Sequence, residues 1–134
     1  MALLFADSFD DRTAETYLKW DSASNAFTYQ AGRTGNSGRL APTGVAKLAY
    51  KTLASNYATL IVGMAYKAQF IRDGAIFLSF NDTQGTRQTY VRSNGSGTLS
   101  VVGGGGSVLA TSTQVITSGD FYYIELKATI HDTT

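Results

Sequence analysis

The stretch ATLIVGMAYKAQF, from Ala58 to Phe70, decides the fold, because its apolar side chains recur at every second residue. Alternate residues of a strand point to opposite faces of a sheet, so a period of two predicts a strand. One face takes Leu60, Val62, Met64, Tyr66, Ala68 and Phe70, and the other takes Thr59, Ile61, Gly63, Ala65, Lys67 and Gln69. We expect a second layer to cover the first face.

The segment from Phe121 to Ile130 repeats this pattern near the end of the chain. Its apolar face consists of Tyr122, Ile124, Leu126, Ala128 and Ile130. Glu125 and Lys127 fall on the opposite face, so we expect both to point away from the core.

Short runs of β-branched and aromatic residues alternate with Gly, Asn, Ser and Asp clusters along the rest of the chain, which is typical of strands and turns. The predicted turns are Asn81–Gly85, Asn94–Gly97 and Gly103–Gly106. The further predicted strands are Leu3–Phe5, Tyr17–Trp20, Phe27–Gln30, Arg39–Ala41, Ala46–Tyr50, Ala75–Asn81, Gln88–Arg92, Thr98–Val102, Val108–Thr111 and Val115–Ile116. Strand starts recur about every 10 to 12 residues, which predicts an all-β, two-sheet antiparallel sandwich of the jelly-roll type.

We expect the 134 residues to form a single β-sandwich domain, residues 1–134, since this length suits one domain. The final residues, from His131 to Thr134, read as the first half of a turn. Either one or more C-terminal strands are lacking, or another subunit completes the edge.

The charge balance predicts that the protein binds neither nucleic acid nor a membrane. Eleven Lys and Arg oppose ten Asp and Glu, and the basic residues are scattered. No apolar run approaches the ~20 residues that span a bilayer. The start of the chain has no basic region and does not read as a signal peptide. The chain has no Cys, so no disulfide or thiolate chemistry is expected.

We expect no enzymatic activity and no catalytic residues. The chain has two Glu, Glu15 and Glu125, whereas glycoside hydrolysis needs two carboxyl groups that flank one bond. The single histidine, His131, lies at the C-terminus without a nucleophile motif upstream.

No metal site or cofactor is predicted. Carboxylates gather at Asp7, Asp10 and Asp11 and again near Asp73 and Asp82, and calcium prefers such oxygen ligands. Asp at strand ends more often forms Asx turns, so we favour turns and keep calcium as the alternative.

Aromatic residues are the candidate contact sites. We expect Trp20 and Tyr66 to fill the core. The candidates for a protein interface or for stacking against a glycan are Tyr123, Phe121, Tyr29, Tyr57 and Tyr90. Tyr123 is the first choice, because it shares a strand face with Glu125 and Lys127.

Three stretches resemble the concanavalin A-like lectin/glucanase superfamily in its laminin-G-like form. They are LLFADSFD at Leu3–Asp10, RTGNSGRL at Arg33–Leu40 and DFYYIELK at Asp120–Lys127. The resemblance implies two curved antiparallel sheets and a role as a glycan-binding lectin, a glucanase or a structural module. The Glu-x-Asp-x-Glu motif of the family's glucanases is missing here.

The start at Met1 with LLFADSFD is similar to virion proteins of tailed bacteriophages. We therefore predict a non-catalytic structural or decoration module of a virion, at the head, neck or tail, that binds other virion proteins and forms a homo-oligomer. The alternative is a carbohydrate-binding module for host-surface recognition. The expected location is the virion in both cases.

Overall fold

The described part of the chain contains eight β-strands and no helix. This computed structural model describes residues 20–21, 27–31, 33, 36–40 and 48–129. The chain divides into an N-terminal unit, Met1–Asn56, and a C-terminal unit, Tyr57–Thr134, and each is described by itself. The prediction of an all-β antiparallel protein is confirmed.

In the described residues of the N-terminal unit, β1 (Phe27–Ala31) and β2 (Asn36–Leu40) form an antiparallel hairpin. The predicted strand Phe27–Gln30 is confirmed. The strand predicted at Arg39–Ala41 begins earlier, because the glycine-containing run before Arg39 pairs with β1. The predictions at Leu3–Phe5 and at residues 17–19 lie outside the described residues. Of Ala46–Tyr50, residues 48–50 are described, and they form no strand beyond an isolated bridge at Tyr50.

Asp21 fastens two distant parts of the N-terminal unit together. Its backbone N–H donates to the Tyr50 carbonyl at 3.0 Å. Its carboxylate accepts from Lys51 Nζ at 2.8 Å and from the Thr52 N–H at 2.6 Å. The hydrogen bond from Lys51, followed by that from Thr52, lowers the pKa of Asp21 to about 2. The carboxylate therefore stays ionised and holds residues 50–52 down to acidic pH.

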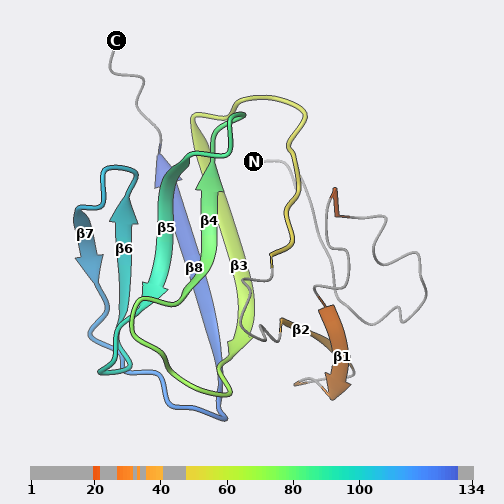
Figure 1. Ribbon diagram of the computed structural model, residues 1–134, viewed down its shortest axis with the longest axis vertical. Coiled ribbons are helices and arrows are strands. Elements are labelled where there is room, and N and C mark those ends of the chain that lie inside the picture. Colours follow the sequence, from red (N-terminus) through yellow and green to blue (C-terminus); the bar gives the residue numbers. More distant parts are fainter. Residues whose placement is uncertain (1–19, 22–26, 32, 34–35, 41–47, 130–134) are drawn as a thin grey trace. The chain divides into compact units, whose positions relative to one another are not determined.

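The C-terminal unit begins and ends with two strands that pair with each other (Figure 1). β3 (Thr59–Lys67) and β8 (Phe121–Thr129) form an antiparallel two-stranded sheet over nine residue pairs, from Thr59↔Thr129 to Lys67↔Phe121. Both strands were predicted from their period of two, and their exposed and shielded residues alternate accordingly. Glu125 and Lys127 are exposed, as expected.

The four strands between them form a second antiparallel sheet in the order β4-β5-β6-β7. These strands are β4 (Ile76–Asn81), β5 (Arg87–Ser93), β6 (Leu99–Gly103) and β7 (Val108–Thr111). Residues 68–75 lead from β3 into this sheet, and residues 112–120 lead from it to β8. The two sheets make the predicted β-sandwich, and jelly-roll topology stays a prediction.

The hairpins of the four-stranded sheet use the same turn three times. In each, a glycine N–H donates to the carbonyl three residues earlier: Gly85 to Asp82 at 3.1 Å, Gly97 to Asn94 at 2.9 Å and Gly106 to Gly103 at 2.9 Å. The φ angles of these glycines are 82°, 85° and 87°. This is the hairpin loop in which a type I turn precedes a left-handed residue. The three turns predicted at these positions are confirmed.

Part of the core of the C-terminal unit lies between the two sheets, while the fully buried Val102 belongs to the opposite face of the four-stranded sheet. Val91 of β5 and Leu126 of β8 are buried, as is Ile116 of the connecting segment. The ring of Tyr66 on β3 stacks on Phe77 of β4 with centroids 4.5 Å apart, so this pair joins the sheets. Phe77 is the extra residue of a bulge, since the register shifts between Ile76 and Leu78.

Two details of the predicted strands are wrong. Phe70 was assigned to the core, but β3 ends at Lys67 and the Phe70 side chain is 76% exposed. Val115–Ile116 forms no strand. The Ile116 N–H instead donates to the carbonyl of Gly97, in the turn between β5 and β6, at 2.9 Å. Ile116 is buried in the core, whereas the Val115 side chain is 45% exposed.

Replacing Gly97 by Ala is expected to destabilise the protein more than replacing Gly85. Both residues have a left-handed φ, which costs an L-residue about 1–2 kcal/mol. A Cβ at Gly97 would also lie 2.7 Å from the Ile116 carbonyl oxygen and 2.9 Å from Val115 Cγ1, whereas a Cβ at Gly85 meets nothing within 4 Å. Urea unfolding should show G97A to be less stable than G85A by a further ~1–3 kcal/mol. Equal losses would contradict this contact.

Replacing Tyr66 by Phe is expected to flatten the alkaline fall in stability. Burial raises the pKa of Tyr66 above its ordinary value of 10.0, so the stability linked to its neutral form is complete below pH 10 and is lost as the pH rises toward the folded-state value. Phe keeps the ring stack and cannot ionise. Urea midpoints between pH 8 and pH 11 should fall less for Y66F than for the wild type. Y123F, which alters an exposed ring, serves as the control.

Candidate functional site

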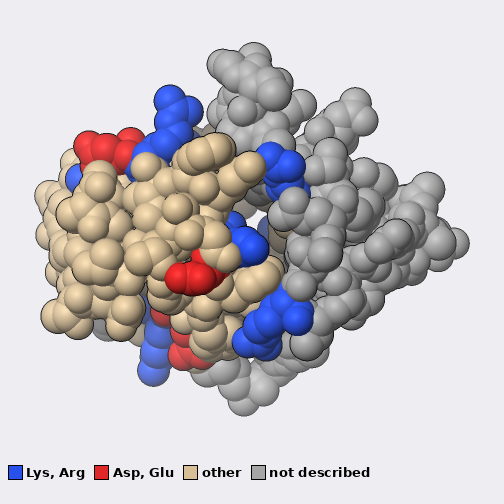
Figure 2. Space-filling model, turned by 90° about the horizontal axis from the view of Figure 1, so that it is seen from below, with Lys and Arg blue, Asp and Glu red and all other residues tan. Residues whose placement is uncertain are grey.

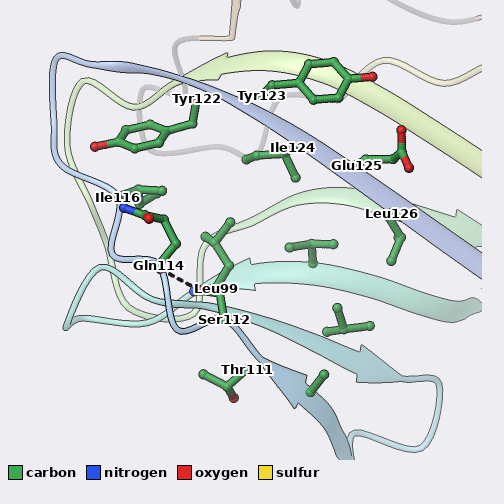
Figure 3. Close-up of a pocket in the computed structure, with 13 residues that line it drawn as sticks. Leu99, Thr111, Ser112, Gln114, Ile116, Tyr122, Tyr123, Ile124, Glu125 and Leu126 are labelled. Atoms are coloured by element: carbon green, nitrogen blue, oxygen red, sulfur yellow. Dashed lines mark hydrogen bonds between the residues drawn. The ribbon is translucent and has the colours of Figure 1, made fainter.

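A groove of about 370 Å³ opens in the C-terminal unit beside β8 (Figure 3). Its floor is the four-stranded sheet, which contributes Val91, Leu99, Val101 and Ala110. The register pairs Ser93 with Leu99, Val91 with Val101 and Val101 with Ala110, and antiparallel residues directly opposite each other share a face. These floor residues therefore belong to the inner face of the sheet, from the buried Val91 on β5 to the exposed Ala110 on β7.

One wall of the groove is the edge of β8. Five consecutive residues, from Tyr122 to Leu126, line it. Successive side chains of a strand point to opposite faces, so a cavity that touches five in a row runs along the strand's edge. Figure 3 shows Ile124 and Leu126 toward the sheet and Tyr123 and Glu125 away from it. Among the described strands, β8 pairs with β3 alone, so this edge has no partner strand there.

The segment between β7 and β8 closes one end of the groove. Ser112 Oγ donates to the Gln114 carbonyl at 2.7 Å and accepts from the Leu99 N–H at 2.9 Å (Figure 3). Farther on, Tyr122 Oη accepts from the Thr117 N–H at 3.0 Å. These bonds tie the segment to β6 and to β8, so the end wall is set by short-range hydrogen bonding.

Tyr123, the first choice among the predicted contact residues, lies at the rim of the groove and is 67% exposed. Its ring leans toward β3: a Cβ at Gly63 would overlap Tyr123 Oη and lie 3.0 Å from Cζ. The absence of a side chain at Gly63 therefore gives the ring its place. Because the ring leans to the β3 side, it leaves the opposite edge of β8 uncovered.

The other predicted contact residues are not brought together with Tyr123 in one site. Phe121 shares its strand face but is half-buried, with Lys67 Nζ 5.1 Å from its ring centroid. Tyr90 is half-buried on β5, on the sheet face opposite to Val91, with the Arg87 guanidinium 5.9 Å from its ring.

Two predicted contacts lie outside the groove's surroundings. Tyr57 is half-buried in the segment before β3. Tyr29 lies in β1 of the N-terminal unit, and its side chain is outside the described residues. Of the two aromatic residues expected in the core, Tyr66 packs on Phe77, and Trp20 is half-buried.

The outer strand of the four-stranded sheet is unusually apolar for an edge. All four residues of β7 are exposed, and the side chains of Val108 and Leu109 are 50% and 66% exposed. An exposed apolar edge strand is a surface that proteins normally cover. β7 also borders the groove, since Ala110 is among the residues that line it.

Of the carboxylates considered for calcium, Asp73 and Asp82 accept hydrogen bonds from turn residues, and Asp7, Asp10 and Asp11 lie outside the described residues. Asp82 accepts from the Gln84 N–H at 2.9 Å, the Thr86 N–H at 2.8 Å and Gln88 Nε2 at 3.0 Å. Asp73 accepts from the Gly95 N–H at 2.9 Å. The bond from the Gln84 N–H to Asp82 is that of an Asx turn, whereas the bond to Asp73 comes from the next hairpin turn along the chain. Within the described ranges, no three His, Cys, Asp or Glu side chains group together to hold a metal ion.

Charge is spread thinly over the described surface. On the face that Figure 2 shows, the basic and acidic side chains form small separate groups and no large field of one sign. The described residues also contain no helix with the length and hydropathy to cross a membrane.

The groove itself was missed by sequence reasoning. Its floor residues were assigned to strands, and Tyr123 was recognised as exposed, but a period of two reports which face a residue takes and not which strand lies beside it. The one available signal was the resemblance of the strand at Phe121–Ile130 to a family in which further strands follow.

Comparison with protein-family models, with curated proteins and with solved structures finds no match to the chain. The inference of function therefore rests on the residues of the groove and on the sequence patterns described above.

Proposed function

We propose that this protein is a non-catalytic structural module of a tailed-bacteriophage virion, at the head, neck or tail, that binds other virion proteins through the groove beside β8. The observation that carries the proposal is this apolar recess of about 370 Å³, which is bordered by an unpaired strand edge in the described part of the chain. The similarity of LLFADSFD, Leu3–Asp10, to virion proteins of tailed bacteriophages supports the context.

The chemistry of the groove suits protein binding. Its floor is built from aliphatic side chains, and Tyr123 of the bordering strand has an exposed ring that leans toward β3. Protein interfaces typically have an apolar core that is enriched in aromatic residues. Glu125 supplies the one carboxylate among the lining residues. The expected homo-oligomer belongs to the same proposal.

Filling the groove is expected to detach the protein from particles. Ala110 is exposed and lines the groove, so A110W places an indole there with little strain on the fold. Particles purified from cells that supply the wild-type chain should contain it by mass spectrometry. Particles supplied with A110W should hold at least about tenfold less, which corresponds to ~1.4 kcal/mol of binding free energy.

The matched control is T83W, because Thr83 is exposed in the turn between β4 and β5, outside the groove. It should associate like the wild type. Absence of the wild-type chain from particles, or loss of T83W together with A110W, would contradict the proposal. Sedimentation of the same purified chains tests the homo-oligomer.

Glycan binding is the second candidate, and the exposure of Tyr123 favours it. Sugars stack on exposed rings, and Tyr123 presents its ring beside the charged side chains Glu125 and Lys127.

A glycan array probed with and without calcium tests this candidate. Binding that Tyr123→Ala removes and that Tyr50→Ala leaves intact would support it, because Tyr50 is an equally available ring, 51% exposed, in the other unit. An array without signal in either condition would exclude it.

A further inference from the structure

We propose that the groove receives an extended segment of a partner protein, that this segment pairs antiparallel with the open edge of β8, and that it carries the pattern acidic-apolar-basic. The inference rests on the proposed function and specifies the chemistry of the partner's segment. Addition of a strand to an open sheet edge is an established mode of peptide recognition.

The edge of β8 supplies the backbone part of the site. Residues Tyr122–Leu126 line the groove in sequence, and the N–H and C=O groups on that side have no partner strand among the described residues. Tyr123 leans over Gly63 on the opposite side and leaves this edge open. Each strand pairing in the described part is antiparallel, and the same pairing is expected for the added segment.

The floor supplies the apolar part of the site. A strand added about 4.8 Å from β8 would lie over Leu99, Val101 and Ala110, with every second side chain directed into the groove. The small side chains of this floor leave space for branched or linear aliphatic residues. A cavity of about 370 Å³ is in the usual range of ~300–1,000 Å³ for ligand sites.

The shape of the groove excludes the β8 of a second copy as the occupant. In Figure 1, β6 and β7 extend past β8 on the side away from β3. A two-fold antiparallel pairing of two β8 strands would put both four-stranded sheets on the same side of the joined sheet. The extensions of the two copies would then occupy the same space. A single extended segment carries no second sheet that could overlap with the four-stranded sheet, so it does not clash.

The outward side chains of β8 specify the charges of the segment. Glu125 and Lys127 are exposed on one face, and neither has an ion-pair partner within 4.0 Å among the described residues. In an antiparallel neighbour with an apolar residue opposite Leu126, the preceding residue lies opposite Lys127 and the following residue opposite Glu125. Opposite charges across strands are favourable, so an acidic residue should precede the apolar one and a basic residue should follow it.

A usable probe is the sequence of β8 itself, because Glu125-Leu126-Lys127 has this order of charges. We would display FYYIELKAT, the sequence of Phe121–Thr129, on a flexible linker at the end of a carrier protein. The control carrier displays FYYIKLEAT, which has the same composition and places like charges opposite Glu125 and Lys127. Fluorescence anisotropy with the full 134-residue chain measures binding, and hydrogen exchange reports protection of the β8 amides.

The wild-type chain is expected to prefer FYYIELKAT over FYYIKLEAT by about tenfold, because two favourable pairs become two unfavourable ones. A chain with both Glu125→Lys and Lys127→Glu should reverse this preference, and its net charge is unchanged. Binding should raise protection along β8. A110W should lose binding of FYYIELKAT, whereas T83W should keep it.

Four results would overturn the inference: no binding of either probe, equal binding of both, no reversal by the double substitution, or binding that A110W leaves intact. A dimer that A110W dissociates would assign the groove to a second copy. If the β8 amides are protected before any probe is added, and A110W removes this protection, the groove is occupied by the chain's own residues. If A110W detaches from particles while the charge preference is missing, the proposed function stands and this inference fails. If the wild-type chain shows a clear charge preference but is absent from particles, this inference stands and the proposed function fails.

Discussion

The pairing of β3 with β8 is the interaction on which the C-terminal unit depends, because it joins segments that are separated by the whole four-stranded meander. It returns the chain to its starting strand and places the inner residues of both strands over β4 and β5. Neighbouring strands lie about 4.8 Å apart, so two strands span roughly half the width of four. The unequal widths of the two sheets are therefore built into the topology, and the uncovered half of the wider sheet is the groove.

The groove keeps its shape because its borders are fixed independently of any occupant. Its floor is held by the β5-β6 and β6-β7 ladders. Its end wall is held by the hydrogen bonds of Ser112, and the same segment is anchored where Ile116 enters the core beneath Gly97. A site that exists before binding loses little conformational entropy when it is filled. A partner segment would then bear most of the ordering cost.

Much of the fold could be predicted. β3 and β8 bury one face each, and a half-buried strand must alternate. The strands of the four-stranded sheet were recognised from their β-branched and aromatic runs between turns, since β5 buries Val91 on one face and β6 buries Val102 on the other. The turn glycines were recognisable from their spacing, since the left-handed position admits few other residues. The strand predicted at Val115–Ile116 was wrong because two apolar residues define no period. The core position predicted for Phe70 was wrong because the alternation of apolar residues continues past the last backbone hydrogen bond of the β3-β8 pairing. Tyr123 was correctly expected at the surface, but its contact with Gly63 depends on a pairing of residues from opposite ends of the unit that no local pattern encodes.

The division of the chain into two units has a spectroscopic consequence. The single tryptophan, Trp20, lies in the N-terminal unit, whereas five of the eight tyrosines, Tyr57, Tyr66, Tyr90, Tyr122 and Tyr123, lie in the C-terminal unit. Emission excited at the red edge of the tryptophan band therefore reports on the first unit, and tyrosine emission is weighted toward the second. Coincident melting curves from the two signals mean one cooperative transition, and separate curves mean that the units unfold independently. The distribution of aromatic residues thus allows the unfolding of the two units to be followed separately without added labels.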